Sequence, residues 1–182
     1  MKFKAAISTI AFILFLQSTL MAETNEINYG IGTDISAYFM NGYSLRASVV
    51  FDHLEIDMGI GRNDTPTWIL TEGIESAVVE HTDLTIKYNL GKNVTNMFLG
   101  LICLYAYSDV DYSSTDDQVE FWNTALLASV GYNMQISNHF RLIPSLGAGY
   151  IFAGDKEKTI DGLTYSMENY IVGGAIELFY YF

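Results

Sequence analysis

Residues Met167 to Phe182 read MENYIVGGAIELFYYF. Every second residue back from the terminus is apolar, aromatic or glycine: Phe182, Tyr180, Leu178, Ile176, Gly174, Val172 and Tyr170. Glu177 and Asn169 lie between them, on the other face. A period of two predicts a β-strand with two unlike faces. The length matches a tilted strand crossing a bilayer, which needs about 9 to 11 residues in the hydrocarbon. The stretch therefore predicts the closing strand of an outer-membrane β-barrel.

The chain begins with the layout of a secretory signal peptide, residues 1–22, which leaves residues 23–182 as the barrel. Two lysines precede an apolar run, Ala5 to Leu16, and a small residue, Ala22, ends the segment. The run is shorter than the ~20 residues that a membrane-spanning helix needs. Cleavage after Ala22 leaves 160 of the 182 residues, with a net charge of −14.

Composition excludes several classes of protein. Half of the residues are hydrophobic, yet no later run reaches the length of a membrane-spanning helix, so the apolar residues favour a barrel. The acidic balance argues against nucleic acid as a partner. The single cysteine, Cys103, excludes an intrachain disulfide and a zinc site built on several thiolates, and indicates a small apolar residue on a lipid-facing strand.

Alternating patterns predict an all-β fold, an eight-stranded antiparallel up-and-down transmembrane barrel. The expected strands are Ile27 to Phe39, Tyr43 to Asp52, Leu54 to Gly61, Val78 to Leu90, Asn96 to Tyr107, Phe121 to Ile136, Phe140 to Ala153, and Met167 to Phe182. Pro144 cannot donate a ladder hydrogen bond, so we expect a bulge there or a position near the rim.

The connections between these strands alternate in length. Short turns are expected at Asp52-His53, Gly91 to Thr95 and Ser137 to His139, and long connections at Arg62 to Ala77, Ser108 to Glu120 and Gly154 to Ser166. Membrane barrels place short turns in the periplasm and long loops outside. The turn at Met40-Asn41-Gly42 is the exception, because it is external yet short, and its Asn-Gly pair supplies a positive φ.

The face on which the apolar residues lie distinguishes a membrane barrel from a soluble, lipocalin-like one. A lipocalin is apolar inside, whereas a membrane barrel is apolar outside. Eight strands leave an interior only wide enough for side chains, so the bulky set must point outward and the glycines and charges inward. In the strand Asn96 to Tyr107, which is apolar on both sides, Met97, Leu99, Leu101, Cys103, Tyr105 and Tyr107 are expected outside.

The inward set contains both signs of charge. The cations are Arg46, Lys87 and Arg141, and the acids are Asp34, Glu55, Asp57, Asp83 and Glu177. Buried charges must be paired, so we expect Arg46 with Asp34 or Asp57, Lys87 with Glu55 or Asp57, and Arg141 with Glu177. Such a cluster is either a gate in a polar conduction path or a solid plug that fixes the strands. The narrow interior favours the plug.

With these residues in view, the chain resembles the small eight-stranded outer-membrane proteins of the OmpA, OmpX and opacity type. The resemblance is carried by LIPSLGAGYIF, Leu142 to Phe152, and by GGAIELFYYF, Gly173 to Phe182. It implies that the barrel-insertion machinery reads Phe182, Tyr180, Leu178 and Ile176. Aromatic residues near the strand ends fit two girdles at the headgroup level.

Two groups of residues invite a more specific function. The segment Asp109 to Glu120 carries oxygen-bearing side chains at the spacing of an EF-hand calcium loop, but Ser114 stands where that loop needs glycine and strands flank it. We therefore interpret it as a solvated acidic loop. His81, near Asp83 and Glu80, is the one histidine placed to act as a general base, but it lacks an identifiable serine partner.

The sequence thus predicts an integral outer-membrane barrel with a non-catalytic structural or surface-interaction role, with no catalytic, cofactor or metal residues assigned. Its expected partners are outer-membrane lipid and lipopolysaccharide, the barrel-insertion machinery, and a host or surface ligand for the loops. The alternatives are a narrow channel or carrier for small apolar molecules, and a lipid-modifying enzyme that uses His81.

Overall fold

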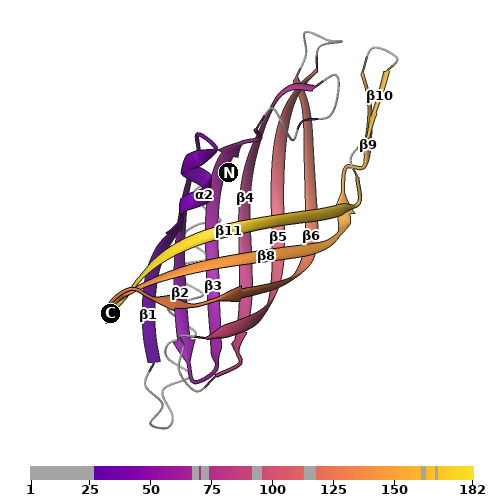
Figure 1. The fold of residues 1–182 in the computed structure, drawn as a ribbon. Helices are drawn as coiled ribbons and strands as arrows, with labels where there is room; N and C mark the ends of the chain where they lie inside the picture. Colours follow the sequence, from indigo (N-terminus) through magenta and orange to yellow (C-terminus); the bar gives the residue numbers. More distant parts are fainter. Residues whose placement is uncertain are drawn as a thin grey trace.

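The computed structural model describes residues 27–66, 70, 74–91, 96–112, 118–160, 163–166 and 168–182, and most of them lie in strands (Figure 1). The strands are β1 Ile27–Asp34, β2 Tyr43–Phe51, β3 Leu54–Asp64, β4 Ile74–Asn89, β5 Met97–Tyr112, β6 Gln118–Tyr132, β7 Met134–Gln135, β8 Phe140–Gly154, β9 Glu157–Ile160, β10 Leu163–Ser166 and β11 Tyr170–Tyr181. One short helix, α2 Ile35–Phe39, follows β1. No helix of the described part is long and apolar enough to cross a membrane.

The last strand closes the sheet into a ring. Sequential neighbours pair antiparallel from β1 to β6, and β8 follows β6, with the two-residue β7 continuing β6 along β8. β11 then pairs with β8 from Tyr170 to Tyr180 on one side and with β1 from Glu177 to Tyr181 on the other. The result is an eight-stranded antiparallel barrel, which confirms the predicted fold class.

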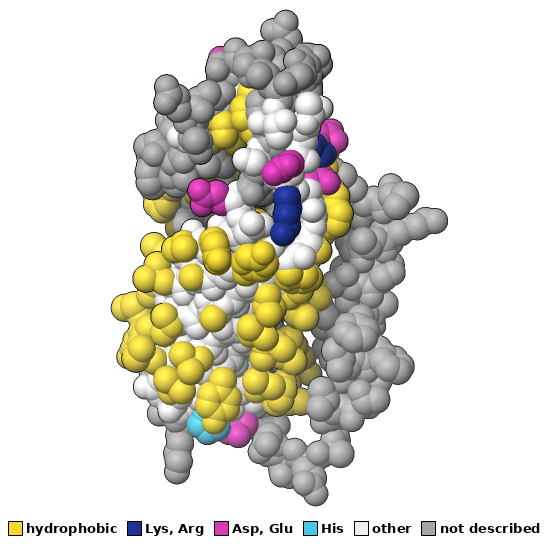
Figure 2. All heavy atoms as spheres, turned by 90° about the vertical axis from the view of Figure 1, so that its right-hand side faces the viewer, with side chains coloured by type: hydrophobic (Ala, Val, Ile, Leu, Met, Phe, Trp, Pro, Cys, Tyr) yellow, Lys and Arg dark blue, Asp and Glu magenta, His cyan; other side chains and the backbone are white. Residues whose placement is uncertain are grey.

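The apolar residues lie on the predicted face of the barrel wall. Outward side chains are large and apolar, and Figure 2 shows them as a hydrophobic belt with charged side chains gathered beyond it. In β5, Leu99 is 54% exposed whereas its neighbour Phe98 is 1% exposed, so the predicted register of this strand is confirmed. A belt of this kind is the surface that lipid tails require.

Aromatic rings gather at both ends of the belt. At the end with the short turns, Phe140 packs edge-on against Tyr180 with ring centroids 5.1 Å apart, and Tyr180 packs against Phe182 at 5.3 Å. At the other end, Tyr105 stacks near Trp122 at 6.4 Å. These clusters fit the two predicted girdles, because amphipathic rings prefer the headgroup level.

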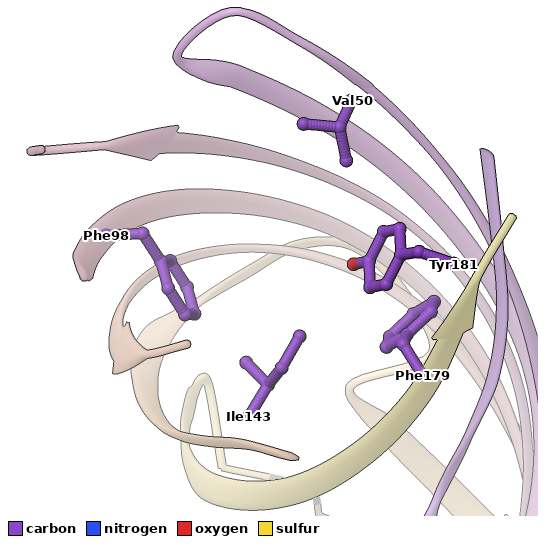
Figure 3. Packing of buried hydrophobic residues seen from close by; sticks show 5 residues of the cluster. All are labelled: Val50, Phe98, Ile143, Phe179 and Tyr181. Atoms are coloured by element: carbon purple, nitrogen blue, oxygen red, sulfur yellow. The ribbon is translucent and has the colours of Figure 1, made fainter. Parts of the chain in front are cut away.

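The interior near the short turns is filled by large apolar side chains. Val50, Phe98, Ile143, Phe179 and Tyr181 pack together there and are at most 3% exposed (Figure 3). The prediction that bulky residues point outward is wrong for this layer. The interior of an eight-stranded barrel is filled by side chains, so large apolar side chains occupy the part that the charged side chains leave empty.

The predicted strand from Ile27 to Phe39 is wrong in its second half. The chain leaves the sheet at Asp34, whose carboxylate accepts a hydrogen bond from the Ser36 backbone N–H at 2.9 Å and caps α2. The helix ends when the Met40 N–H bonds back to the Ala37 carbonyl at 3.0 Å. Asn41 has the predicted positive φ, +50°, but it follows a helix and not a strand.

The long outer connections are shorter than predicted, because strand pairing continues beyond the belt. β3 runs to Asp64 and β4 starts at Ile74, while β5 runs to Tyr112 and β6 starts at Gln118. The predicted connection from Gly154 to Ser166 contains the β9–β10 hairpin. Beyond the belt, backbone groups still form hydrogen bonds between neighbouring strands. The sequence does not show these strand ends, because no side chain there faces lipid and the apolar alternation is lost.

The predicted strand from Phe121 to Ile136 is interrupted at Asn133, since β6 ends at Tyr132 and β7 continues along β8 to Gln135. Of the two alternatives expected for Pro144, the bulge is absent, and the residue lies close to the start of β8 at Phe140. The pairing of β8 stops at Ser145 and resumes at Leu142 in the same register, so the proline leaves a gap in the ladder. The register of β8 against β6 shifts instead between Thr124 and Ala125.

The inner apolar layer makes a testable contribution to stability. Phe98→Ala should lower the free energy of unfolding by about 3–5 kcal/mol, because it opens a cavity in a tightly packed layer. The matched control, Leu99→Met, changes a lipid-facing neighbour at nearly constant volume and should cost less than about 1.5 kcal/mol. Urea titration in lipid vesicles, followed by heat-modifiable gel migration, measures both. Equal losses would contradict the assignment of the two faces.

Candidate functional site inside the barrel

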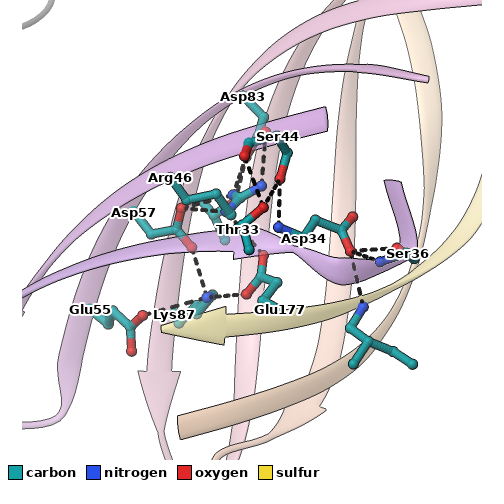
Figure 4. A network of polar contacts seen from close by, with 12 residues as sticks. Thr33, Asp34, Ser36, Ser44, Arg46, Glu55, Asp57, Asp83, Lys87 and Glu177 are labelled. Carbon is teal, nitrogen blue, oxygen red and sulfur yellow. Dashed lines mark hydrogen bonds and ion pairs between the residues drawn. The ribbon is translucent and has the colours of Figure 1, made fainter. Parts of the chain in front are cut away.

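Six charged side chains from four strands meet inside the barrel, each 7% exposed or less (Figure 4). They are Arg46 of β2, Glu55 and Asp57 of β3, Asp83 and Lys87 of β4, and Glu177 of β11. We call this set the ion cluster. The alternation of each strand aims these residues inward, while their neighbours face lipid. The strand register brings them to a common level.

Arg46 pairs with three acidic side chains of the ion cluster. Its Nη2 lies 2.7 Å from an Asp57 carboxylate oxygen and 2.5 Å from an Asp83 oxygen, and its Nε lies 3.1 Å from Glu177. The predicted pair with Asp57 is confirmed. Asp83, which sequence reasoning placed inward without assigning it to Arg46, is a second partner.

Gly59 makes the contact between Arg46 and Asp83 geometrically feasible. It lies between them in the register, opposite Arg46 on β2 and opposite Asp83 on β4. A Cβ at Gly59 would come within 2.7 Å of both the Arg46 guanidinium and the Asp83 carboxylate. A glycine flanked by opposite charges in neighbouring strands is therefore a signal from which this pair could have been predicted.

Lys87 completes the ion cluster. Its Nζ lies 2.7 Å from Asp57, 2.9 Å from Glu177 and 3.5 Å from Glu55, so both predicted partners are confirmed and Glu177 is added. The ammonium also lies 5.3 Å from the centre of the Phe179 ring, in the apolar layer below. Such an arrangement is favourable because ring faces carry negative charge.

The predicted pairing of Arg141 with Glu177 is wrong. In the β8–β11 ladder Glu177 lies opposite Ile143, and Arg141 lies opposite Phe179. The Arg141 guanidinium instead stacks over the Tyr181 ring, 4.0 Å from its centre. The Tyr181 hydroxyl in turn donates to Glu55 at 3.1 Å, a link that alternation alone did not reveal.

The alternative partner considered for Arg46, Asp34, has another role. Its carboxylate caps α2 and also accepts the Ile176 backbone N–H at 3.3 Å. Asp34 therefore joins the end of β1 to β11, outside the ion cluster.

The arrangement of the ion cluster suits a structural plug. Four carboxylates shared by two cations tie β2, β3, β4 and β11 together across the interior. Buried ions remain stable only when their partners satisfy them, and here each cation contacts three carboxylates. The apolar layer of Figure 3 fills the space between the ion cluster and the short turns.

The three histidines lie at separate places. His53 and His139 sit in short turns, where each Nδ1 lies within 3.0 Å of a backbone carbonyl and each ring stacks on a tyrosine, Tyr88 or Tyr180. His81 faces inward from β4, and its ring occupies the space that a side chain at Gly61 would need. The structure thus gives the two turn histidines a capping role at the strand ends.

The acidic segment from Asp109 to Glu120 has a different form from the predicted loop. Asp109 and Asp111 belong to β5, and Glu120 belongs to β6, directly opposite Asp109. The stretch 113–117 lies outside the described residues. The ends of the EF-hand-like spacing are therefore held in a strand ladder, where an EF-hand needs a loop.

Comparisons with known proteins bear on the fold. No protein-family model and no curated protein matches the chain. Among solved structures, Neisserial surface protein A is similar, with a TM-score of 0.54 and 12% identity over 88% of this chain and all of that one. The N-terminal β-barrel domain of Pseudomonas aeruginosa OprF matches with a TM-score of 0.52 and 13% identity, covering 87% of this chain and all of that one.

A major outer membrane protein of Thermus thermophilus is similar to the same degree, with a TM-score of 0.52 and 11% identity over 88% of this chain and all of that one. The chain therefore has the fold of the small eight-stranded outer-membrane β-barrels, as its sequence predicted. The hydrophobic belt gives this fold the surface it needs in the outer membrane.

The ion cluster predicts a large effect of removing one cation. Arg46→Met should lower the free energy of unfolding by about 3–5 kcal/mol, because it leaves buried carboxylates without their partner. Arg62→Met is the matched control, since Arg62 forms a half-exposed pair with Glu80 at 3.8 Å. It should cost about 0–1 kcal/mol. Urea-dependent folding in vesicles distinguishes the two, and similar losses would argue against a tightly coupled cluster.

Proposed function

We propose that the protein is a non-catalytic outer-membrane barrel that contacts other molecules at the cell surface through its outer end. The observation that carries this proposal is the division of the molecule into an interior that is filled from the ion cluster to the short turns and an outer end that projects. The ion cluster and the apolar layer occupy the inside, whereas strands and charged side chains extend beyond the belt (Figures 1 and 2). Binding on rigid scaffolds is commonly carried by such extensions.

The β9–β10 hairpin is the part of the outer end best suited to contact a partner. It projects beyond the ring of strands, and its two strands pair only with each other among the described strands (Figure 1). Both outer edges therefore keep backbone donors and acceptors that an extended segment of another protein can use.

The base of the hairpin is fixed to the barrel, which reduces the entropy lost on binding. The Asp155 N–H donates to the Trp122 carbonyl at 2.8 Å, and the Asp155 carboxylate pairs with Lys158 at 2.9 Å. Lys158 also donates to the Glu120 carbonyl. The hydrogen bond from Lys158 holds the pKa of Asp155 below its usual value, so this carboxyl is charged at neutral pH.

The remaining partners follow from the same proposal. Outer-membrane lipid and lipopolysaccharide cover the belt, and the insertion machinery reads the closing strand with Phe182, Tyr180, Leu178 and Ile176. A host or surface ligand binds at the outer end. The acidic charge of the chain makes a basic or neutral partner surface the better electrostatic match.

Replacing residues 156–167 with a short Gly-Ser turn tests the role of the hairpin. We expect the variant to fold and to show normal heat-modifiable migration, because the hairpin lies outside the ring of strands. Binding of cells expressing the variant to host cells or extracellular matrix should be lost. Lys156→Gln is the matched control, since it changes one charge beside the hairpin and keeps its backbone. Undiminished binding after the replacement would contradict this role.

Conductance tests the filled interior. The refolded protein in a planar lipid bilayer should show no ion conductance, because the ion cluster and the apolar layer leave no continuous aqueous path between them. Steady conductance steps would favour the channel alternative. A lipid-modifying activity that disappears in His81→Ala would favour the enzyme alternative.

A further inference from the structure

The barrel wall is incomplete on one side. β1 pairs with β11 only from Gly30 to Asp34, opposite Tyr181 to Glu177. β11 extends further toward the outer end, to Tyr170, and on its other side it pairs with β8 along this whole length. Beyond Asp34 the chain forms α2, which touches β11 near Ile176 but pairs with no strand. We call the region between α2 and residues Tyr170 to Gly174 the seam.

The seam exposes backbone hydrogen-bonding groups at the level of the membrane. The N–H groups of Ile176 and Phe182 point to the β1 side, since they donate to Asp34 and to the Tyr29 carbonyl. Alternate residues of a strand point the same way, so the N–H groups of Gly174, Val172 and Tyr170 also face the seam. Lipid does not tolerate such groups without an acceptor.

The most exposed large apolar side chains of the described residues flank the seam. Phe39 of α2 and Val172 of β11 are each 83% exposed, and Tyr170 is 73% exposed. An apolar groove on the outer face, lined by Val130, Leu146 and Gly174, reaches Ser36 of α2 at the same place.

The inner face of β11 behind the seam is not tightly packed. Three inward residues of β11 there are small or partly exposed, Ile171, Gly173 and Ala175, and Gly173 lies opposite Gly147 of β8. A Cβ at Gly173 would meet no atom within 4 Å.

This inner face is also apolar. Ile102, Leu104 and Ile171 are partly buried against a cluster of Ala125, Leu127 and Ile151. The ion cluster, through Glu177, forms the floor below it. The inner face beside the seam is thus apolar, and the ion cluster lies between it and the periplasmic end.

We propose that the seam is a lateral binding site for one ester-linked acyl chain of an outer-leaflet phospholipid. The acyl chain fits the apolar inner face, and the ester carbonyl oxygens accept hydrogen bonds from the β11 N–H groups that have no ladder partner among the described strands. Both parts of the ligand lie at the depth of the seam in the bilayer, because ester groups sit just below the headgroups. This site goes beyond the surface contacts proposed above and does not depend on them.

A second copy of the chain fits the seam poorly. Two copies in one membrane share the same orientation, so their β11 strands run in the same direction. The ladder that β1 begins along β11 is antiparallel, and such a copy cannot continue it.

Photocrosslinking tests the site. The refolded protein is placed in phosphatidylcholine vesicles that contain a phosphatidylcholine with a diazirine at the end of one acyl chain, and labelled residues are mapped by mass spectrometry. We expect labels on inward residues, Ile171, Ala175 and Leu104. A parallel sample contains free palmitic acid with a terminal diazirine.

Two variants separate the inner site from general contact with lipid. Gly173→Leu places a branched side chain on the inner face at a position where its Cβ meets no atom within 4 Å, and it should remove the inward labels. Val172→Leu places the same side chain on the lipid face and should leave them unchanged. Heat-modifiable migration verifies that both variants are folded.

The outcomes are distinct. Inward labelling by the phospholipid that disappears only in Gly173→Leu supports the proposal. Labels confined to outward residues such as Val172 and Leu146 would overturn it, as would inward labels that survive Gly173→Leu. Inward labelling by free palmitic acid alone would also overturn it, because the occupant would then be a free fatty acid.

Discussion

The requirement that every backbone group in lipid find a hydrogen-bond partner inside the protein governs this structure. β11 meets it by pairing with β8 and β1 at once, which removes the free edges of the sheet over the lower part of the barrel. Closure with eight strands then fixes a narrow interior, and that interior must be filled by side chains. The ion cluster and the apolar layer below it are the two solutions this chain uses.

The two fillings are coupled by shared residues. Lys87 pairs with carboxylates on one side and lies over the Phe179 ring on the other, and Tyr181 belongs to the apolar layer while its hydroxyl donates to Glu55. Removing a charge from water costs free energy. The contacts of Lys87 with carboxylates and with a ring face offset part of that cost. The ion cluster and the apolar layer therefore both stabilise the same register of the strands that carry these residues.

The sequence predicted the strands well where one face meets lipid, because a one-residue slip there would expose polar residues to the membrane. This is why the ambiguous β5 could be placed from Gly100 and Ala106 alone. The predictions failed where lipid gives no signal. Asp34 starts a helix through a local cap, the outer ends of β3 to β6 pair without alternation, and the partner of Arg141 depends on the stagger between β8 and β11.

These constraints also show which parts of the structure are free to vary with function. Solved barrels with 11–13% identity share the fold over their whole length, so the fold can be kept while most side chains change. Function must then depend on features that closure does not dictate. Among the described residues, two features are not dictated by closure, namely the hairpin that projects beyond the ring and the seam where β1 stops short of its partner. Both have strand edges without a ladder partner among the described strands, one beyond the belt and one within it, and the partners we propose for them differ for that reason.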